Sequence, residues 1–492
     1  MPLHPAGLAS GAPWSRRATI GAAGALALLA AVIRALARPG RPMWFDEAVT
    51  LDLARAPSQL LHEALTHGEA NGGLFTLLVR AALRLGDEVG ADELLVARLV
   101  STVAGVLAVP ALFLAARRLV GDRPALLAAL LLAASRTHVH YSLEARGYSL
   151  AVLLVILSTW SLVALLDGAG PGMALTFGLL AGLATWTHLF GALVLAAQAG
   201  AAVLHPAVRG PTGAPGSPAV RRDLAIGLLV AVIGSATVAL LAVRGDVGQV
   251  TWIPVLSWPQ VAATLVTLAG HARALFLPAV AGLVVVAATA RRGGDLAFGP
   301  ALAAAWFLVP LGLAVAISAV KPLLVPRYLL VAQPGFLLLV ALGLCALRRP
   351  RLIALAALLA LALEGRELLI RPRTRDPLWQ PIDEVAARLI EVSRPGDALV
   401  VNHPALARSL DREFRRLGRG PGPERVAPPP GPSSASSTAA SLESLLAGRA
   451  GALFVLFAEQ PDAAAGRAAF ARTGRITVDE DRGGIRLLRL ER

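Results

Sequence analysis

The stretch YSLAVLLVILSTWSLVALL, residues 148–166, contains nineteen residues and no charged side chain. A helix needs about 20 consecutive, mostly apolar residues to cross the hydrocarbon core of a bilayer. Residues 148–166 therefore predict a membrane-spanning helix, and similar apolar runs recur along most of the chain.

The composition of the whole chain agrees with this prediction. Of its 492 residues, 56% are hydrophobic and 16% are charged. Soluble domains usually contain about 45–50% apolar and about 25% charged residues. The excess of apolar surface indicates contact with lipid rather than one very large protein core.

The apolar runs predict about eleven membrane-spanning helices, and the count stays open by one or two because some runs are short. The runs lie at residues 18–37, 99–116, 124–135, 148–166, 173–187, 188–205, 223–243, 275–290, 298–319, 327–347 and 351–370.

Arginines gather in alternate connections between these runs and account for the formal net charge of +14. Cytoplasmic loops carry such an excess of basic residues, so the N-terminus is predicted inside and residues 371–492 outside. Nucleic-acid binding is not indicated, because no basic stripe with interleaved aromatic residues and no zinc-finger spacing occurs. The arginines of the predicted inner connections are Arg16, Arg17, Arg117, Arg118, Arg123, Arg209, Arg221, Arg222, Arg291, Arg292, Arg348, Arg349 and Arg351.

The first run also resembles a secretory signal, since Arg16-Arg17 precedes an apolar stretch and small residues. A retained membrane anchor is the preferred interpretation, because the run is longer than the apolar core of a typical signal. If it is retained as a span, the arginine-rich connections also all fall on the predicted cytoplasmic side. The single cysteine, Cys345, lies in an apolar run and excludes an intramolecular disulfide and a cysteine-rich metal site.

Two parts of the chain differ from the apolar runs. The outer loop 38–98 contains amphipathic pieces at Ser58–Leu65 and Leu74–Leu85, which suit helices lying in the membrane interface. Residues 371–492 contain short strand patterns and a segment rich in Pro, Gly and Ser that predicts a flexible loop. The strand patterns lie at 398–401, 452–457 and 485–490, and the loop lies at 419–441.

The expected fold is therefore an all-α polytopic membrane domain over residues 1–370, which includes the loop 38–98. A small extracytoplasmic α/β domain follows over residues 371–492.

Two adjacent carboxylates, Asp46 and Glu47, directly follow the first apolar run. A carboxylate near an apolar boundary has a raised pKa and suits a general base, and a pair of carboxylates also suits a divalent metal. The alternative is a solvated pair that begins an interfacial helix, with Asp46 as its N-cap. Taken by itself, the Asp46-Glu47 pair favours this structural role over a catalytic one.

A second polar segment, residues 138–148, joins two apolar runs on the outer side. Arg146 offers a planar fork that fits phosphate, and Tyr141 and Tyr148 offer hydroxyl groups at the membrane interface. The alternative is an aromatic belt in which Glu144 pairs with Arg146 or both extend toward water. His138 and His140 alternate, which is poor spacing for a zinc site on a helix.

Two further segments carry polar groups at predicted outer ends. Lys321, Arg327 and Tyr328 surround two prolines before a long apolar run, at the depth where the phosphate of a lipid would lie. The alternative is a pair of cations that anchor a helix end. Glu69 and Asn71 precede an amphipathic helix, which by itself indicates little more than a helix start.

Taken together and in this order, these segments resemble the GT-C glycosyltransferases of the family of protein O-mannosyltransferases and lipid A aminoarabinose transferases (glycosyltransferase family 39-like). Asp46-Glu47 matches the acidic pair of the first outer loop in this family, and residues 141–148 closely match its Tyr-Ser-x-Glu-Ala-Arg-x-Tyr segment. Residues 327–329 match its Arg-Tyr-Leu start of a late span. At 72–73 the chain has Gly-Gly where the family usually has Pro-Pro. This departure weakens any role that the resemblance assigns to Glu69 and Asn71.

The resemblance implies an inverting transfer of a mannose- or pentose-like sugar from a polyprenyl monophosphate lipid to a cell-envelope glycan, lipid or protein. It implies Asp46 as base, with Glu47 beside it. Arg146, Lys321 and Arg327 would hold the donor phosphate, together with Tyr148 and Tyr328. Glu69, Asn71, Tyr141 and Glu144 would position the acceptor, and a divalent metal stays open.

Two other functions compete with this one. A lipid or glycolipid transporter would also be polytopic and basic on the inside, but transporters usually show internal repeats and ionisable residues at mid-span. In this chain the ionisable residues gather at predicted outer ends. A non-catalytic scaffold of the cell envelope is the second alternative. No motif for nucleotide binding, a serine nucleophile or a zinc protease occurs.

Overall fold

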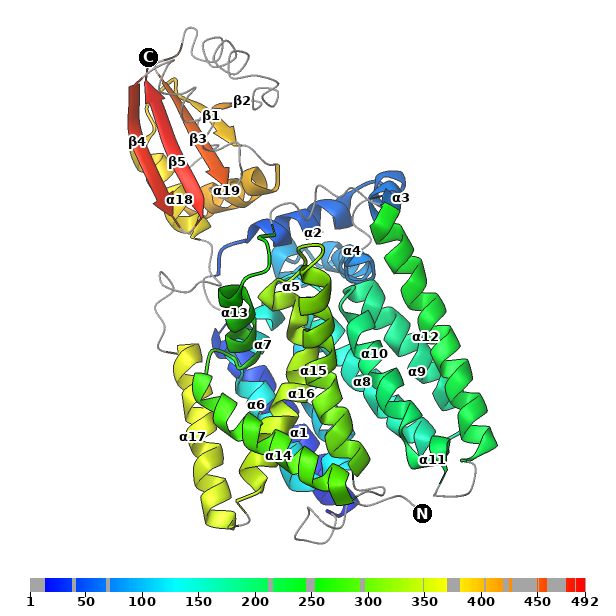
Figure 1. The fold of residues 1–492 in the computed structure, drawn as a ribbon. Coiled ribbons are helices and arrows are strands. Elements are labelled where there is room, and N and C mark those ends of the chain that lie inside the picture. The colour runs from blue at the N-terminus through cyan, green and yellow to red at the C-terminus, as the bar shows by residue number, and fades with distance from the viewer. Residues whose placement is uncertain are drawn as a thin grey trace. The chain divides into compact units, whose positions relative to one another are not determined.

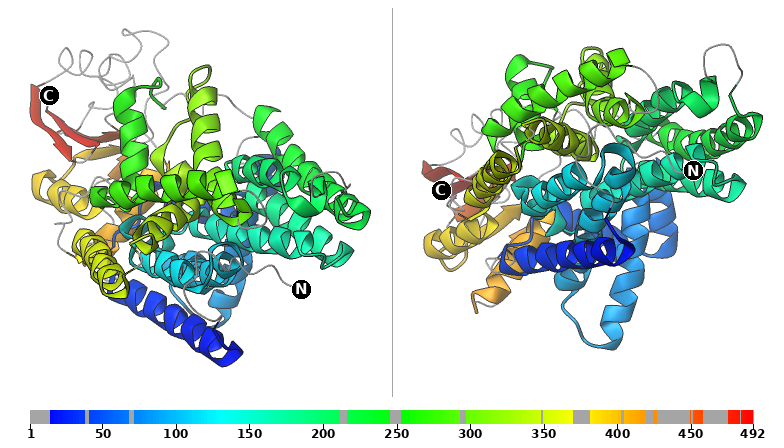
Figure 2. Two further views of the ribbon diagram at one scale, coloured as in Figure 1. Left: turned by 60° about the horizontal axis from the view of Figure 1, so that its bottom comes forward. Right: turned by 90° about the horizontal axis from the view of Figure 1, so that it is seen from below.

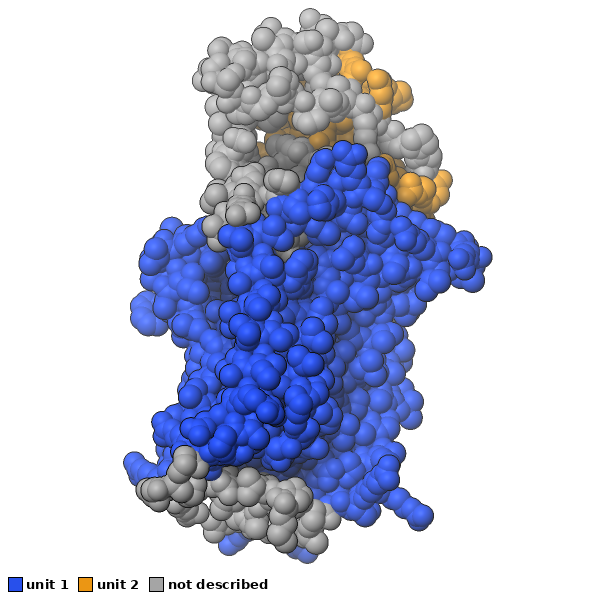
Figure 3. All heavy atoms as spheres, turned by 90° about the vertical axis from the view of Figure 1, so that its right-hand side faces the viewer, with its two compact units in different colours: residues 1–39, 53–370 blue, residues 40–52, 371–492 orange. Residues whose placement is uncertain are grey.

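A computed structural model of the chain confirms an all-helical membrane domain and a small sheet domain (Figure 1). The chain divides into two compact units, coloured separately in Figure 3: unit 1 is residues 1–39 and 53–370, and unit 2 is residues 40–52 and 371–492. The structure describes residues 14–37, 41–67, 71–210, 216–244, 253–292, 297–347, 349–369, 381–401, 404–418, 424–426, 449, 451–457, 475–482 and 484–491.

Unit 1 is a bundle of helices (Figure 2). Its long helices are α1 (Arg16–Ala37), α4 (Gly73–Glu88), α5 (Glu93–Val120), α6 (Asp122–Ala134), α8 (Tyr148–Leu166), α9 (Pro171–Thr187), α10 (Gly191–Val203), α12 (Pro218–Arg244), α14 (Phe276–Arg292), α15 (Phe298–Ser318), α16 (Gln333–Cys345) and α17 (Pro350–Leu369). Shorter helices are α3 (Ser58–His67), α7 (Arg136–Ser142), α11 (Pro206–Arg209), α13 (Trp258–Leu268), η2 (Arg273–Leu275) and η4 (Pro326–Ala332). Helix α2 (Phe45–Arg55) begins in unit 2 and ends in unit 1.

All eleven apolar runs of the sequence coincide with helices of unit 1. Among the described residues, seven helical segments are long and apolar enough to cross a membrane, namely Arg16–Ala37, Glu93–Val120, Tyr148–Leu166, Pro218–Leu241, Arg273–Arg291, Phe298–Ser318 and Pro326–Cys345. Helices α6, α9 and α10 contain only 13, 17 and 13 residues. The structure thus confirms the helical membrane domain but not the number of spans.

Glycines allow helices α9 and α12 to approach closely. A Cβ atom on Gly178 would lie 2.6 Å from the carbonyl oxygen of Gly227, and one on Gly234 would lie 3.2 Å from the Cα of Gly182. Small residues at such an interface let helix backbones pack directly, which is a main source of helix association in membranes. The contact extends to the end of α9, where Trp186 Nε1 donates to the Gly234 carbonyl at 3.0 Å.

The two amphipathic pieces of the loop 38–98 form α3 and α4, as the sequence predicts. Arg55 at the end of α2 donates two hydrogen bonds to Asp87 near the end of α4. These bonds hold the pKa of the Asp87 carboxyl below its usual range. Arg80 of α4 also donates to the Ala54 carbonyl at 3.1 Å.

Unit 2 contains a mixed sheet of five strands in the order β2-β1-β3-β5-β4. Strand β1 pairs with β2 and β3 in parallel, and β5 pairs with β3 and β4 antiparallel. The strands are β1 (Ala398–Val401), β2 (Glu424–Val426), β3 (Gly451–Phe457), β4 (Arg475–Arg482) and β5 (Ile485–Glu491).

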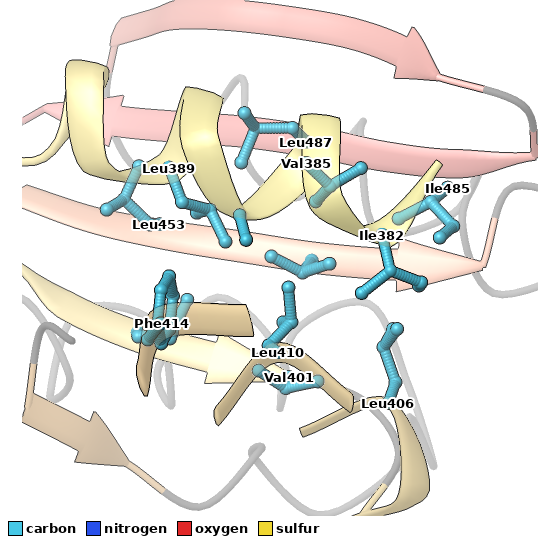
Figure 4. Packing of buried hydrophobic residues seen from close by; sticks show 13 residues of the cluster. Ile382, Val385, Leu389, Val401, Leu406, Leu410, Phe414, Leu453, Ile485 and Leu487 are labelled. Atoms are coloured by element: carbon cyan, nitrogen blue, oxygen red, sulfur yellow. The ribbon is translucent and has the colours of Figure 1, made fainter. Parts of the chain in front are cut away.

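Two helices, α18 (Ile382–Val392) and α19 (Pro404–Arg416), pack on one face of this sheet (Figure 4). Successive side chains of a strand point to opposite faces. Accordingly, Leu399 and Val401 join the core beneath the helices, whereas Ala398 and Val400 join a second apolar cluster on the other face.

The α/β fold of this domain is as expected, but one local prediction is wrong and one strand was not predicted. Residues 424–426, assigned from sequence to a flexible loop, form strand β2 and pair with β1. Strand β4 was not predicted, because it is an edge strand whose second half, residues 479–482, is entirely charged and shows no alternation of apolar and polar residues.

Residues 40–52 group with the C-terminal domain in unit 2, whereas the sequence places them with the membrane domain. Phe45 of α2 packs against the core between the sheet and its helices. Asp52 of α2 forms an ion pair with Arg408 of α19.

Candidate functional site

Helix α2 carries the acidic pair in its first turn. The helix begins at Phe45, so Trp44 precedes it, and the Trp44 backbone N–H donates to Glu47 Oε2 at 2.9 Å. A glutamate at the third helical position that reaches back in this way caps the helix. The alternative of Asp46 as N-cap is therefore wrong. Glu47 is buried and Asp46 is half-buried, so the two carboxylates differ in accessibility.

The segment that matches the family most closely, residues 141–148, begins at the end of α7 and leads through bends into α8. Helix α5 supports its backbone with two hydroxyl groups. Ser101 Oγ donates to the Arg146 carbonyl at 2.9 Å, and Thr102 Oγ1 donates to the Ser142 carbonyl at 2.9 Å. Polar residues of an apolar helix thus satisfy carbonyl groups that no helix or sheet pairs, as buried backbone groups require.

The late segment at 326–332 meets the start of α8, although the two are far apart in sequence. Arg327 Nε donates to the Tyr148 hydroxyl at 3.0 Å across 179 residues of chain. The rings of Tyr148 and Tyr328 stack with their centroids 6.5 Å apart. The guanidinium carbon of Arg146 lies 6.0 Å from the centroid of the Tyr148 ring.

His188 and Phe190, in the turn between α9 and α10, complete the cluster and were not identified from sequence. The His188 ring lies 4.9 Å from the Tyr328 ring and 5.5 Å from the Tyr148 ring. Arg146 and Arg327 both lie close enough for their charges to act on this imidazole. A histidine at the first position of the apolar run 188–205, directly after the run 173–187, is the signal that could have revealed it.

Asn71 and Gly147 hold this turn in place. Asn71 Oδ1 accepts a hydrogen bond from the Leu189 backbone N–H at 3.0 Å, which ties the start of α4 to the turn. A Cβ atom on Gly147 would lie 3.0 Å from Thr187 Cγ2 and 3.2 Å from Phe75 Cβ, so any larger residue would require these neighbours to shift by a few tenths of an ångström.

Tyr141 and Glu144 are buried residues of the same segment. The Tyr141 ring lies 4.9 Å from the Tyr148 ring. Glu144 is buried, and its Oε1 lies 2.6 Å from His140 Nε2. The structure thus gives Glu144 a partner in His140, which the sequence did not suggest.

Lys321 and Glu69 are not placed in this cluster. Lys321 has an exposed side chain just before Pro322, and no side-chain contact between it and the tyrosines or His188 is found in the described part of the chain. Glu69 lies outside the described residues.

The arrangement brings two guanidinium groups, two tyrosines and one histidine to the end of the bundle where α8 and α10 begin and α9 ends. Guanidinium groups bind phosphate oxygens in pairs, and tyrosine hydroxyls add further donors. Among the residues that the structure describes, no group of three or more His, Cys, Asp and Glu side chains could hold a metal ion. The cluster is suited to a phosphate group.

Known proteins resemble this chain in one segment and in its fold. Residues 76–216 match the family model of dolichyl-phosphate-mannose-protein mannosyltransferases. The matched segment contains Arg146, Tyr148 and His188 but neither Asp46 nor Arg327. No curated protein sequence matches the chain.

Among solved structures, the chain is similar to ArnT from Cupriavidus metallidurans in the apo state, with a TM-score of 0.54, 15% identity, and coverage of 96% of this chain and 98% of ArnT. ArnT bound to undecaprenyl phosphate gives the same TM-score at 16% identity, with the same coverage of both chains. The Archaeoglobus fulgidus oligosaccharyltransferase complex with Zn and sulfate gives a TM-score of 0.50 at 15% identity, covering 88% of this chain and 67% of that protein. These findings confirm the resemblance to the GT-C glycosyltransferases and the GT-C fold.

Proposed function

We propose that the chain is a membrane glycosyltransferase that takes its sugar from a polyprenyl monophosphate at the extracytoplasmic face and passes it to a cell-envelope acceptor. The observation that carries the proposal is the meeting of Arg146, Arg327 and Tyr148 at one end of the helix bundle. The family match of residues 76–216 and the likeness to an ArnT bound to undecaprenyl phosphate support it.

The two arginines suit a lipid monophosphate in number and in geometry. Such a phosphate carries one to two negative charges, which two guanidinium groups balance. Each planar fork can donate two parallel hydrogen bonds to phosphate oxygens. The same contacts would stabilise the phosphate as it leaves the sugar, when its negative charge grows.

In this proposal Asp46 acts as the base. It takes the proton of the acceptor hydroxyl while that oxygen attacks the anomeric carbon. The bond from that carbon to the phosphate oxygen breaks, and the polyprenyl phosphate leaves on the opposite side, which inverts the configuration. Glu47 holds the first turn of α2 through its bond to the Trp44 N–H and so fixes the helix that presents Asp46.

The test is to incubate the purified chain with radiolabelled polyprenyl-phosphate sugars, mannose- and pentose-bearing, and with membrane fractions as acceptors. The proposal expects label to leave the lipid for an envelope glycan, lipid or protein, and free polyprenyl phosphate to appear. A lipid transporter would instead move the intact labelled lipid across a vesicle membrane without cleaving it, and that result would replace the proposal.

A further inference from the structure

His188 is a buried histidine whose two ring nitrogens have different surroundings. Its Nδ1 accepts a hydrogen bond from the Phe190 backbone N–H at 3.3 Å, within its own turn. Its Nε2 has no hydrogen-bond partner in the part of the chain that the structure describes, although only 5% of the residue is exposed. A buried polar group without a partner is costly, so this nitrogen calls for an explanation.

The hydrogen bond at Nδ1 fixes where the proton lies. A neutral imidazole carries one proton, and the nitrogen that accepts a hydrogen bond cannot bear it. The proton is therefore on Nε2, which is a donor at the opposite edge of the ring from the bond to the Phe190 N–H. The ring lies against Tyr148 and Tyr328, within reach of the charges of Arg146 and Arg327.

We propose that His188 is a further ligand of the donor phosphate, and that its Nε2–H donates a hydrogen bond to a phosphate oxygen. The charge balance supports a neutral donor at this position. Two arginines already match the two negative charges that the phosphate reaches as it leaves the sugar, so a further phosphate oxygen is best satisfied by a hydrogen bond without additional charge. This inference rests on the proposed function, because it assigns the same site to the same lipid.

The competing explanation is that His188 serves only to cap its turn. In that case the bond from the Phe190 N–H to Nδ1 is what matters. The two roles use opposite sides of the ring, so substitutions can separate them. His188→Asn keeps an acceptor near the position of Nδ1 and removes the donor. His188→Gln keeps a donor near the position of Nε2, and His188→Met has the same length without any donor.

The chain provides a matched control in His205, near the other end of α10. His205 is also buried, and its Nδ1 also accepts a backbone hydrogen bond, from the Ala207 N–H at 3.1 Å. His205→Asn thus makes the same chemical change at the opposite end of this helix.

The experiment is isothermal titration of undecaprenyl phosphate into the purified full chain in detergent. Undecaprenol and inorganic phosphate serve as separate probes for the lipid and for the free anion. A hydrogen bond to a charged group corresponds to about tenfold to hundredfold in affinity. We expect His188→Asn and His188→Met to lose this factor for undecaprenyl phosphate, and His188→Gln and His205→Asn to remain near the unaltered chain.

Three results would overturn the inference. The capping explanation wins if His188→Asn binds normally while His188→Gln and His188→Met are equally weakened. If the Asn variant does not fold, equal binding of undecaprenyl phosphate by the Gln and Met variants is enough to exclude His188 as a phosphate ligand. If the unaltered chain binds undecaprenyl phosphate no better than undecaprenol, the proposed function fails together with the inference. If it binds through the phosphate and the variants do not differ, only the role of His188 fails.

Discussion

Loss of either site arginine should weaken binding of the donor lipid, and the two losses should not add. Arg146 and Arg327 approach the same tyrosine from two sides, one over its ring at 6.0 Å and the other at its hydroxyl at 3.0 Å. Both also act on His188. Residues that share partners in this way usually couple, by about 0.5–3 kcal/mol.

The size of the single effects follows from the contacts that each arginine can make. Both side chains are half-buried, so their hydrogen bonds to phosphate are only partly screened by water. A hydrogen bond to a charged group contributes about 1.5–3 kcal/mol, which corresponds to about tenfold to hundredfold in Kd. Arg146→Ala and Arg327→Ala should each weaken binding by this factor, and the double variant by less than the product. Arg146→Lys should restore little, because an ammonium group cannot make the paired contact.

Titration of undecaprenyl phosphate into the four purified proteins measures this cycle directly. Arg118→Ala is the control, because the Arg118 guanidinium also lies over an aromatic ring, at 5.2 Å from that of Trp160, near the C-terminal end of α5. It should leave the Kd unchanged. Small, strictly additive losses at Arg146 and Arg327, equal to that of the control, would show that these residues only anchor helix ends and would refute the phosphate site.

Three further predictions address the other parts of the account. Asp46→Asn should lower the rate of transfer by about 10²–10⁴ while donor binding persists, since only the general base is lost; near-normal turnover would exclude Asp46 as the base. Arg408→Asp should reduce the rate of transfer by about two- to fivefold, the size expected for an exposed ion pair, because it loosens α2 from its domain. Adding Asp52→Arg to the same chain should restore the rate. A double variant no faster than the single one would show that the ion pair does not hold α2. In a background with Cys345 replaced, single cysteines at 420–440 should react in intact cells with a reagent that cannot cross the membrane, and protection would place the C-terminal domain inside.

Much of the membrane domain could be predicted because a bilayer imposes the length and apolarity of its helices. The eleven runs therefore emerged as helices, including short ones such as α6 and α10. Strand β4 was missed because four consecutive charged residues, 479–482, interrupt the apolar alternation of a strand. Strand β2 was missed because its three residues, in a segment rich in Pro and Gly, are too few to show a period.

The candidate site could be predicted in part, since arginine and tyrosine at helix ends suit a phosphate. Their meeting could not, because the bond between Arg327 and Tyr148 depends on packing across 179 residues. His188 was missed because a single neutral side chain between two apolar runs changes their hydropathy very little. The alternative that made Asp46 the N-cap misplaced the start of α2 by two residues, because Trp44 precedes the helix and the buried Glu47 accepts the hydrogen bond from its N–H.

A structure of the purified chain with undecaprenyl phosphate bound tests the central claim most directly. The account predicts phosphate density within hydrogen-bond distance of the side chains of Arg146, Arg327 and Tyr148, with the polyprenyl tail leaving between helices toward lipid. Phosphate density at the arginine-rich opposite ends of the helices, near Arg117 and Arg118, would contradict it.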